Sequence, residues 1–151
     1  MSDREGLSSP RLSSSKPLSF WEGDAECLPF DSCTFDLYTI TFGLRNVTDP
    51  FRALESAYDK LRPGSRIVVM EFSMPPNPIV RAGYDLYSEA IPPLGKAVAD
   101  DEASYRYLVE SIRAWYSPEE LKGKMEEAGF VGVTVESLNM GVVCIHSGWK
   151  L

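Results

Sequence analysis

Residues 35–72 read FDLYTITFGLRNVTDPFRALESAYDKLRPGSRIVVMEF, and this stretch decides the fold. Its opening part, Phe35 to Phe42, is rich in β-branched and aromatic side chains and predicts a strand that ends at Gly43. Its closing part, Arg66 to Phe72, is a nearly continuous apolar run. Such a run is typical of a strand that is buried on both faces of a parallel sheet.

A helix is expected between these two strands. Asp49 can accept hydrogen bonds from the free N–H groups of a first helical turn, and Pro50 fits the first helical position. Apolar residues recur at helical spacing as far as Leu61, and Pro63-Gly64 is expected to stop the helix. Strand, helix and strand with short connections form a right-handed βαβ unit, so the helix should cover the sheet.

The C-terminal half also has recognisable elements. Residues 75–115 have a helical pattern that Pro92-Pro93 is expected to interrupt. Ser117-Pro118-Glu119-Glu120 predicts a capping box, followed by a helix to Ala128 that ends at a left-handed Gly129. Residues 131–138 and 140–147 predict two final strands that pair antiparallel at the sheet edge. The predicted fold class is therefore α/β.

The bulk properties indicate one globular domain. The chain has 151 residues, and residues 1–19 form a Ser-rich segment that we expect to be disordered, with the domain in residues 20–151. The net charge of −7 argues against non-specific nucleic-acid binding. The three cysteines form no CxxC pair and have no His at ligand spacing, which favours a reducing compartment and predicts no metal site.

Ligands of open α/β sheets bind beyond the carboxyl ends of the strands, in the loops that follow them. Three such loops are expected, at residues 23–30, 41–47 and 71–78. The first follows a short strand fragment that we expect around Phe20-Trp21. These loops are where the chemistry of the chain should lie.

Several polar residues of this region have two interpretations. Asp24 could accept a hydrogen bond from an exocyclic amine such as that of adenine, or it could cap a turn. Arg45 follows a buried strand, where a guanidinium needs a carboxylate, a substrate oxygen or a water as partner, unless it forms a surface salt bridge. The rings and charges of residues 84–87 and 105–113 could bind a ligand or form ordinary amphipathic helices. His146 is expected to be structural.

These residues also resemble a known family. Gly23-Asp24-Ala25-Glu26 resembles the adenine-side motif of class I S-adenosylmethionine-dependent methyltransferases. The octet FGLRNVTD at residues 42–49 is more specific and resembles the ubiquinone/menaquinone biosynthesis C-methyltransferases of the UbiE type. The family resemblance continues through LRPG at 61–64, EFS at 71–73, YDLYS at 84–88, SYRYLVESIR at 104–113 and HSG at 146–148. It covers residues 20–151 in unbroken order.

The resemblance implies methyl transfer from S-adenosylmethionine to a ring carbon of a polyprenyl benzoquinol or naphthoquinol. It implies that Asp24 and Ala25 hold the adenine side of this cofactor and that Thr41 faces the cofactor near its methionine part. Arg45 and Asn46 would be the catalytic residues that line the reaction centre. They would position a base or a water that deprotonates the quinol.

The resemblance also implies a helical lid over residues 75–115, with Tyr84, Tyr87 and Arg113 as substrate-binding residues. The implied partners are the polyprenylated quinol, a second copy of the chain, a quinone-biosynthesis complex and a peripheral contact with a membrane. The implied location is the matrix side of the mitochondrial inner membrane in a eukaryote and the cytoplasm in a bacterium.

The sequence departs from the family pattern at its front. It contains no G-x-G, although class I methyltransferases resemble one another in a glycine-rich first turn, and Ser65 replaces a family glycine. The expected fold is thus a Rossmann-like methyltransferase sheet without its first strands, and we expect this chain alone to bind S-adenosylmethionine weakly or not at all. One alternative is a truncated, non-catalytic interaction subunit. Another is a methyltransferase of the same fold that acts on sterols or other small molecules, which the Arg45-Asn46 loop and the lid motifs disfavour.

Overall fold

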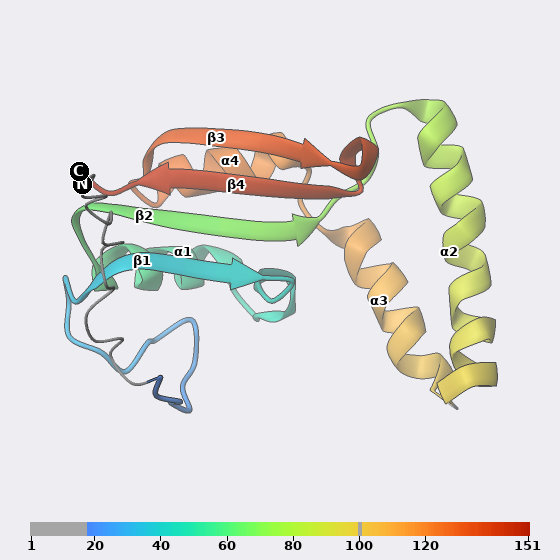
Figure 1. Cartoon of the computed structure of the whole chain (residues 1–151), viewed down its shortest axis with the longest axis horizontal. Coiled ribbons are helices and arrows are strands. Elements are labelled where there is room, and N and C mark those ends of the chain that lie inside the picture. Colours follow the sequence, from blue (N-terminus) through green and yellow to red (C-terminus); the bar gives the residue numbers. More distant parts are fainter. Residues whose placement is uncertain (1–17, 100) are drawn as a thin grey trace, which may run out of the picture.

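The computed structural model describes residues 18–99 and 101–151, so the predicted disordered segment lies almost wholly outside the described residues. The described part of the chain begins with a strand, a helix and a strand, continues with three successive helices and ends in two strands (Figure 1). The elements are β1 (Phe35–Thr41), the 3-10 helix η1 (Leu44–Asn46), α1 (Pro50–Lys60), β2 (Leu61–Phe72), α2 (Pro78–Ala99), α3 (Glu102–Ala114), α4 (Pro118–Glu127), β3 (Val131–Leu138), the 3-10 helix η2 (Asn139–Gly141) and β4 (Val143–Trp149).

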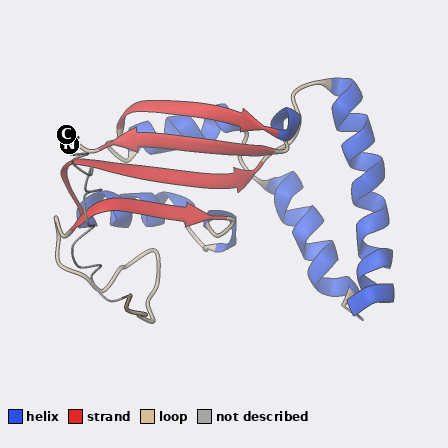
Figure 2. Cartoon of the chain, in the orientation of Figure 1, coloured by secondary structure: helices blue, strands red, loops and turns tan. Residues whose placement is uncertain are grey.

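The four strands form one sheet in the order β1-β2-β4-β3 (Figure 2). β1 and β2 are parallel, and α1 connects them, which confirms the predicted βαβ unit. β4 pairs antiparallel with β2 on one side and with β3 on the other. The predicted α/β class and the terminal antiparallel pair are therefore confirmed, with β3 at the sheet edge and β4 inside.

One face of the sheet is covered and the other is more open. Helices α1 and α4 lie on the same face, behind the sheet in Figure 1. Ile67 and Val69 point to that face and are fully buried, whereas Val68 and Met70 alternate with them and are half-buried. The expectation that this strand is buried on both faces was therefore wrong, because no described helix packs on the second face.

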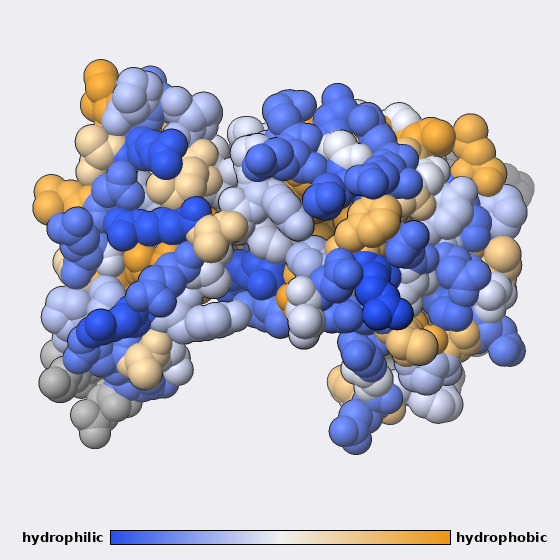
Figure 3. Space-filling view, turned by 180° about the vertical axis from the view of Figure 1, so that it is seen from behind, coloured by the Kyte–Doolittle hydropathy of each residue, from blue (hydrophilic) through white to orange (hydrophobic). Residues whose placement is uncertain are grey.

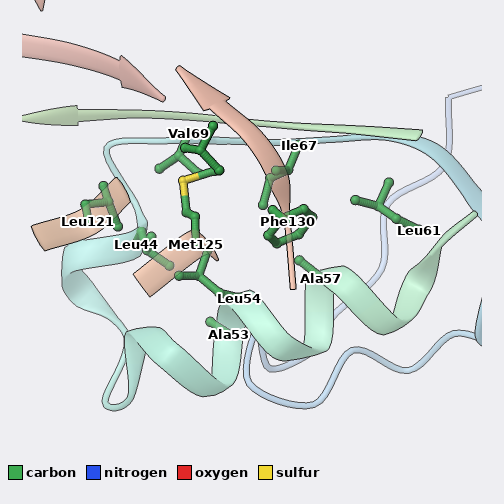
Figure 4. Close-up of a cluster of buried hydrophobic side chains, with 11 residues drawn as sticks. Leu44, Ala53, Leu54, Ala57, Leu61, Ile67, Val69, Leu121, Met125 and Phe130 are labelled. Atoms are coloured by element: carbon green, nitrogen blue, oxygen red, sulfur yellow. The ribbon is translucent and has the colours of Figure 1, made fainter. Parts of the chain in front are cut away.

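The hydrophobic core lies between the covered face and these two helices (Figure 4). Leu44 of η1 is 1% exposed and packs into this core, so the loop that follows β1 is anchored by its own side chain. The fully or nearly buried members are Leu44, Ala53, Leu54, Ala57, Leu61, Ile67, Val69, Leu121, Met125, Phe130 and Val133.

Two boundaries differ from the sequence-based expectation. Helix α1 ends at Lys60 instead of continuing to Pro63-Gly64, and β2 already begins at Leu61, where Leu61 pairs with Phe35. A register shift follows in the pairing of β1 with β2, and Gly64 within it adopts a φ of +81°. The last strand begins at Val143 instead of residue 140, because left-handed residues in η2 turn the chain first.

Two further expectations were wrong. Pro92 and Pro93 lie inside helix α2, which runs on to Ala99; each proline removes one N–H donor without ending the helix. The next helix, α3, begins at Glu102, and the Asp101 carboxylate caps it by accepting from the Ser104 N–H at 3.0 Å. Phe20-Trp21 form no strand. Instead, edge-to-face packing of Trp21 on Phe30 and of Phe30 on Phe35 joins this segment to β1.

The predicted capping box at the start of α4 is confirmed. The Ser117 hydroxyl accepts from the Glu120 N–H, and the Glu120 carboxylate accepts from the Ser117 N–H at 2.8 Å. At the other end Gly129 adopts the predicted left-handed backbone, with φ of +105°. There an added Cβ would approach the Tyr58 ring to 3.0 Å.

Replacing the cap is expected to weaken this helix. Ser117→Ala removes the side-chain acceptor and should lower the free energy of unfolding by about 1 kcal/mol, measured by urea denaturation. Ser117→Thr keeps a hydroxyl at the same place and is the matched control. Equal destabilisation by both substitutions would show that the cap does not stabilise α4.

His146 of β4 is expected to make stability depend on pH. It is 2% exposed, its Nε2–H donates to the Pro118 carbonyl at 2.9 Å, and burial lowers its pKa. Above a pH of about 6.5 the imidazole is neutral in both the folded and the unfolded chain. As the pH falls below this value, the unfolded chain binds the proton first, so the folded state loses stability. Urea midpoints between pH 7 and pH 5 should fall in the wild type and fall less in His146→Gln; identical slopes would contradict this assignment.

Candidate functional site

The chain turns sharply where β1 ends. Phe42 has a φ of +52°, a left-handed conformation that costs a non-glycine residue roughly 1–2 kcal/mol. Its ring stacks on Phe72 at the end of β2, with 4.4 Å between the ring centroids. The Phe42 carbonyl accepts two side-chain hydrogen bonds, from Arg45 Nη1 at 2.8 Å and from Asn46 Nδ2 at 3.2 Å. Stacking and hydrogen bonding thus hold the strained turn in place.

A buried ion pair joins this turn to the next strand. Arg45 Nη1 lies 2.9 Å from Glu71 Oε2, and the two side chains are 8% and 1% exposed. The Glu71 carboxylate also accepts from the backbone N–H groups of Arg45 and Phe72, both at 3.2 Å. The carboxylate expected as one partner of Arg45 is therefore Glu71, and the interpretation as a surface salt bridge was wrong.

The same end of the sheet holds polar atoms that are buried without a partner. They are Arg45 Nε and the Ser73 hydroxyl, which lies just beyond β2. Among the described residues, neither atom forms a hydrogen bond. A buried donor without a partner is costly, so Arg45 Nε is an unsatisfied donor beside the ion pair.

Helix α3 meets the turn through one side-chain hydrogen bond. The Tyr107 hydroxyl lies 3.2 Å from Asn46 Oδ1. Helices α2 and α3 form a hairpin that stands apart from the sheet in Figure 1 and makes a separate lobe beyond a narrow waist in Figure 3. α3 approaches the sheet layer chiefly at η1. The hairpin lies within residues 75–115, where a helical pattern was predicted, and its role as a lid stays a prediction.

A pocket lies where α3 meets η1. Its volume is about 530 Å³, enough for a substituted aromatic ring, and we call it the loop–lid pocket. Two residues of η1 and four of α3 line it: Arg45, Asn46, Ser104, Tyr105, Tyr107 and Leu108. It therefore combines charged and amide donors on one wall with aromatic and aliphatic side chains on the other.

A second pocket, of about 700 Å³, lies on the other side of Asn46; we call it the Asp24 pocket. Asp24 Oδ1 accepts from the Glu26 N–H at 2.9 Å, and Glu26 Oε1 accepts from the Asp49 N–H at 2.9 Å. These bonds fix the 23–30 loop against the start of α1. The lining residues are 22–26 and 46–48, so Asp24, Ala25 and Asn46 lie together.

The other sequence-predicted site residues lie apart from the loop–lid pocket. Thr41 is exposed at the end of β1 and lines neither pocket. Arg113 lies 3.4 Å from Asp85 between α2 and α3, and it lines a separate hollow between these helices. Tyr84 lies near it, and burial raises the pKa of this tyrosine. Tyr87 is 63% exposed on α2.

The residues that sequence reasoning did not assign to the site are Glu71, Tyr105, Tyr107 and Leu108. The signal for Glu71 was its acidic side chain inside an apolar strand, where a charge requires a buried partner. The signal for Tyr107 was weaker, because alternating rings and charges also describe an ordinary amphipathic helix.

Within the described ranges, no group of three or more His, Cys, Asp or Glu side chains is arranged to hold a metal ion. No described helix is both long enough and apolar enough to span a bilayer.

Glu71 is expected to be required for folding stability. Glu71→Gln leaves the Arg45 guanidinium buried without its counter-charge and should cost about 3–5 kcal/mol of unfolding free energy. Asp36→Asn breaks the exposed Arg62–Asp36 pair, whose side chains are 49% and 81% exposed, and serves as the matched control. This control should change stability by less than about 1 kcal/mol. Urea denaturation measures both, and a small loss in Glu71→Gln would contradict the buried-pair assignment.

Comparison with known proteins places this geometry in a family. The sequence profile of the ubiE/COQ5 methyltransferase family matches residues 7–150. The ubiquinone/menaquinone biosynthesis C-methyltransferase UbiE of Roseobacter denitrificans is 50% identical over 135 residues, which are 89% of this chain and 54% of that protein. The mitochondrial 2-methoxy-6-polyprenyl-1,4-benzoquinol methylase of Homo sapiens is 55% identical over 130 residues, 85% of this chain and 40% of that protein. The chain thus spans about half the length of these relatives.

Solved structures show the same fold. Human N-acetylserotonin methyltransferase in complex with SAM superposes with a TM-score of 0.57 at 20% identity, covering 93% of this chain and 36% of that one. A SAM-dependent methyltransferase of Aquifex aeolicus gives a TM-score of 0.53 at 13% identity, covering 88% of this chain and 55% of that one. The predicted methyltransferase-type α/β fold is therefore confirmed, and the chain belongs to the ubiE/COQ5 methyltransferase family.

Proposed function

We propose that this chain provides the substrate side of an S-adenosylmethionine-dependent C-methyltransferase that acts on a polyprenyl benzoquinol or naphthoquinol. The observation that carries the proposal is the loop–lid pocket, in which the ion-paired Arg45 and the amide of Asn46 face Tyr105 and Leu108 of α3. The names of the relatives support the quinol class. The benzoquinol is the substrate class in the human relative's name.

The chemistry of the pocket fits this reaction. A quinol ring carbon becomes nucleophilic when the adjacent hydroxyl loses its proton, so a site that stabilises the quinolate oxygen favours methylation. Arg45 has only donors and stays charged, so it can bind that oxygen but cannot take up its proton. Water accepts the proton instead, and the aromatic and aliphatic wall of α3 orients the ring.

The Asp24 pocket fits the adenine end of the cofactor. When bound, S-adenosylmethionine supplies an electrophilic methyl group. The carboxylate of Asp24 has one oxygen committed to the Glu26 N–H, which leaves the other as an acceptor for an exocyclic amine. Ala25 lines the same pocket and offers a small apolar surface for the adenine ring. In this proposal Thr41 contacts the cofactor toward its methionine part from the exposed end of β1.

The lid residues take part in two ways. Arg113 pairs with Asp85 across α2 and α3, and Tyr84 packs in the same interface, so both would hold the hairpin in the shape that contacts the prenyl tail. Tyr87 is exposed on α2 and would contact the tail directly. The prenyl tail of the proposed substrate is lipophilic, so the proposal includes a peripheral membrane contact.

The proposed setting follows the relatives. The human relative is named as mitochondrial, which supports a mitochondrial location for a eukaryotic chain. Within this proposal, the chain lies on the matrix side of the inner membrane in a eukaryote and in the cytoplasm in a bacterium. A second copy of the chain or a quinone-biosynthesis complex is the proposed protein partner. The open sheet face, where Leu37 and Trp149 are 55% and 44% exposed, favours the alternative of a non-catalytic interaction subunit.

Arg45→Lys tests the proposed role of Arg45. Lysine keeps a positive charge opposite Glu71, whereas Arg45→Ala would leave the Glu71 carboxylate unpaired. Lysine lacks the planar guanidinium with its fork of donors. At a saturating concentration of S-adenosylmethionine, which offsets the weak cofactor binding expected of this chain, we expect turnover to fall about 100-fold, because one preorganised donor is lost from the reaction centre. The weak dissociation constant of the cofactor should stay within about twofold, because Arg45 is assigned to the substrate side. Transfer of a tritium-labelled methyl group to 2-methoxy-6-prenyl-1,4-benzoquinol measures turnover, and calorimetry measures cofactor binding.

The matched control for this test is Arg62→Lys, which changes an exposed guanidinium on β2 that is paired with Asp36. It should leave both quantities unchanged. Equal losses of turnover and cofactor binding in Arg45→Lys would refute the role of Arg45. Quinol binding by the wild-type chain without any methyl transfer would favour the non-catalytic alternative.

A further inference from the structure

The side-chain amide of Asn46 is held in one orientation by two neighbours. Its Nδ2 lies 3.2 Å from the carbonyl oxygen of Phe42, and its Oδ1 lies 3.2 Å from the hydroxyl of Tyr107. A carbonyl oxygen can only accept, so the amide nitrogen must face Phe42. The amide oxygen then accepts from the Tyr107 hydroxyl, which becomes the donor.

This orientation decides what the loop–lid pocket offers a ligand. The Asn46 oxygen is engaged by Tyr107, and one of the two amide N–H groups is engaged by Phe42. The second N–H is left to face a ligand, and Arg45 beside it has no acceptor atoms at all. The wall that η1 contributes to the pocket therefore presents donors.

We propose that Tyr107 is a positioning residue, whose hydroxyl donates to the Asn46 amide oxygen and so holds the amide in the orientation in which Asn46 N–H and Arg45 present donors to a ligand oxyanion. This inference rests on the proposed function, because the oxyanion is the quinolate oxygen of the substrate. The proton that leaves the quinol hydroxyl goes to water, and no bond to Tyr107 or Asn46 forms or breaks.

The position of Tyr107 makes this arrangement depend on the lid. Tyr107 is on α3, and α3 approaches the sheet layer chiefly at η1 (Figure 1). The hydrogen bond can form only while α3 packs against the loop. Without this contact the Asn46 oxygen lacks its donor, and its lone pairs would repel a quinolate in the pocket. The donor wall is thus complete only while α3 packs against η1.

The first test follows the Asn46 amide directly. The sequence contains three asparagines, Asn46, Asn77 and Asn139, so selective 15N-asparagine labelling gives three side-chain amide pairs that can be assigned by substitution. In Tyr107→Phe we expect the Asn46 pair to shift, because the amide oxygen loses its donor, with the Asn77 and Asn139 pairs unchanged. Tyr105→Phe is the matched control. It removes a hydroxyl from the same helix and pocket, and this hydroxyl has no hydrogen-bond partner among the described residues.

The second test measures the donor wall with a coloured phenol. The probe is 2-methoxy-4-nitrophenol, whose phenolate absorbs visible light, so its ionisation can be titrated while it is bound to the full chain. The charged and titratable groups around the pocket are Arg45 and Glu71 from the sheet side and Tyr105 and Tyr107 from α3. We expect the wild type to lower the pKa of the bound probe. In Tyr107→Phe that pKa should be higher by about one unit, a tenfold change in the ratio of phenolate to phenol.

The outcomes separate this inference from the proposed function. An Asn46 amide signal that is the same in the wild type and Tyr107→Phe overturns the positioning role, whatever the probe does. A changed amide signal with an unchanged pKa of the bound probe overturns the donor role toward the ligand. Failure of the probe to bind the wild type counts against both the donor role and the loop–lid pocket as quinol site. The amide measurement would then still show whether Tyr107 holds Asn46.

Discussion

The buried ion pair between Arg45 and Glu71 is the interaction on which the site depends. It joins the turn after β1 to the end of β2, and the two side chains are 8% and 1% exposed. A buried charge must be compensated, so neither side chain can move without the other. The pair fixes Arg45 against the Phe42 carbonyl, and that carbonyl orients Asn46. Asn46 in turn meets Tyr107 of the lid. Each contact depends on the one before it.

The fold places this network at the edge where two parallel strands end. Because β1 and β2 run in the same direction, their carboxyl ends meet, and a residue after one strand can reach a residue at the end of the other. Leu44 anchors the turn by packing into the core, while the next two residues, the buried Arg45 and the exposed Asn46, line the pocket. A short turn with one buried leucine and two polar residues therefore contributes to both the core and the pocket.

The sequence predicted the regular elements well because their signals are local. Asp49-Pro50, the Ser117 capping box and Gly129 each specify a helix end through backbone hydrogen bonding or backbone conformation, and the structure has all three. The sequence-based prediction was wrong at Pro92-Pro93, where the helix continues, and at Phe20-Trp21, where ring packing replaces the predicted strand. Neither outcome can be read from neighbours in the sequence alone.

The site was only partly predictable for the same reason. Arg45 and Asn46 were recognisable from one continuous motif, and Asp24 and Ala25 from another. The contacts that join Glu71 to Arg45 and Tyr107 to Asn46 span 26 and 61 residues of chain, so no local pattern contains them. Tyr84, Tyr87 and Arg113 were assigned to the substrate as part of a lid motif. The structure places Tyr84 and Arg113 between α2 and α3, and Tyr87 on the exposed surface of α2. Tertiary packing decides which side of each helix faces its neighbour, so the motif alone did not show this.

The most direct test of the proposed site is a crystal structure of the chain with bound 2-methoxy-6-prenyl-1,4-benzoquinol. We expect one ring oxygen within about 3 Å of an N–H group of Arg45 or Asn46, with the ring against Tyr105 and Leu108. The prenyl group should leave the pocket along the α2–α3 hairpin. A quinol bound between α2 and α3 beside Arg113, or on the open face of the sheet, would contradict the assignment of the loop–lid pocket.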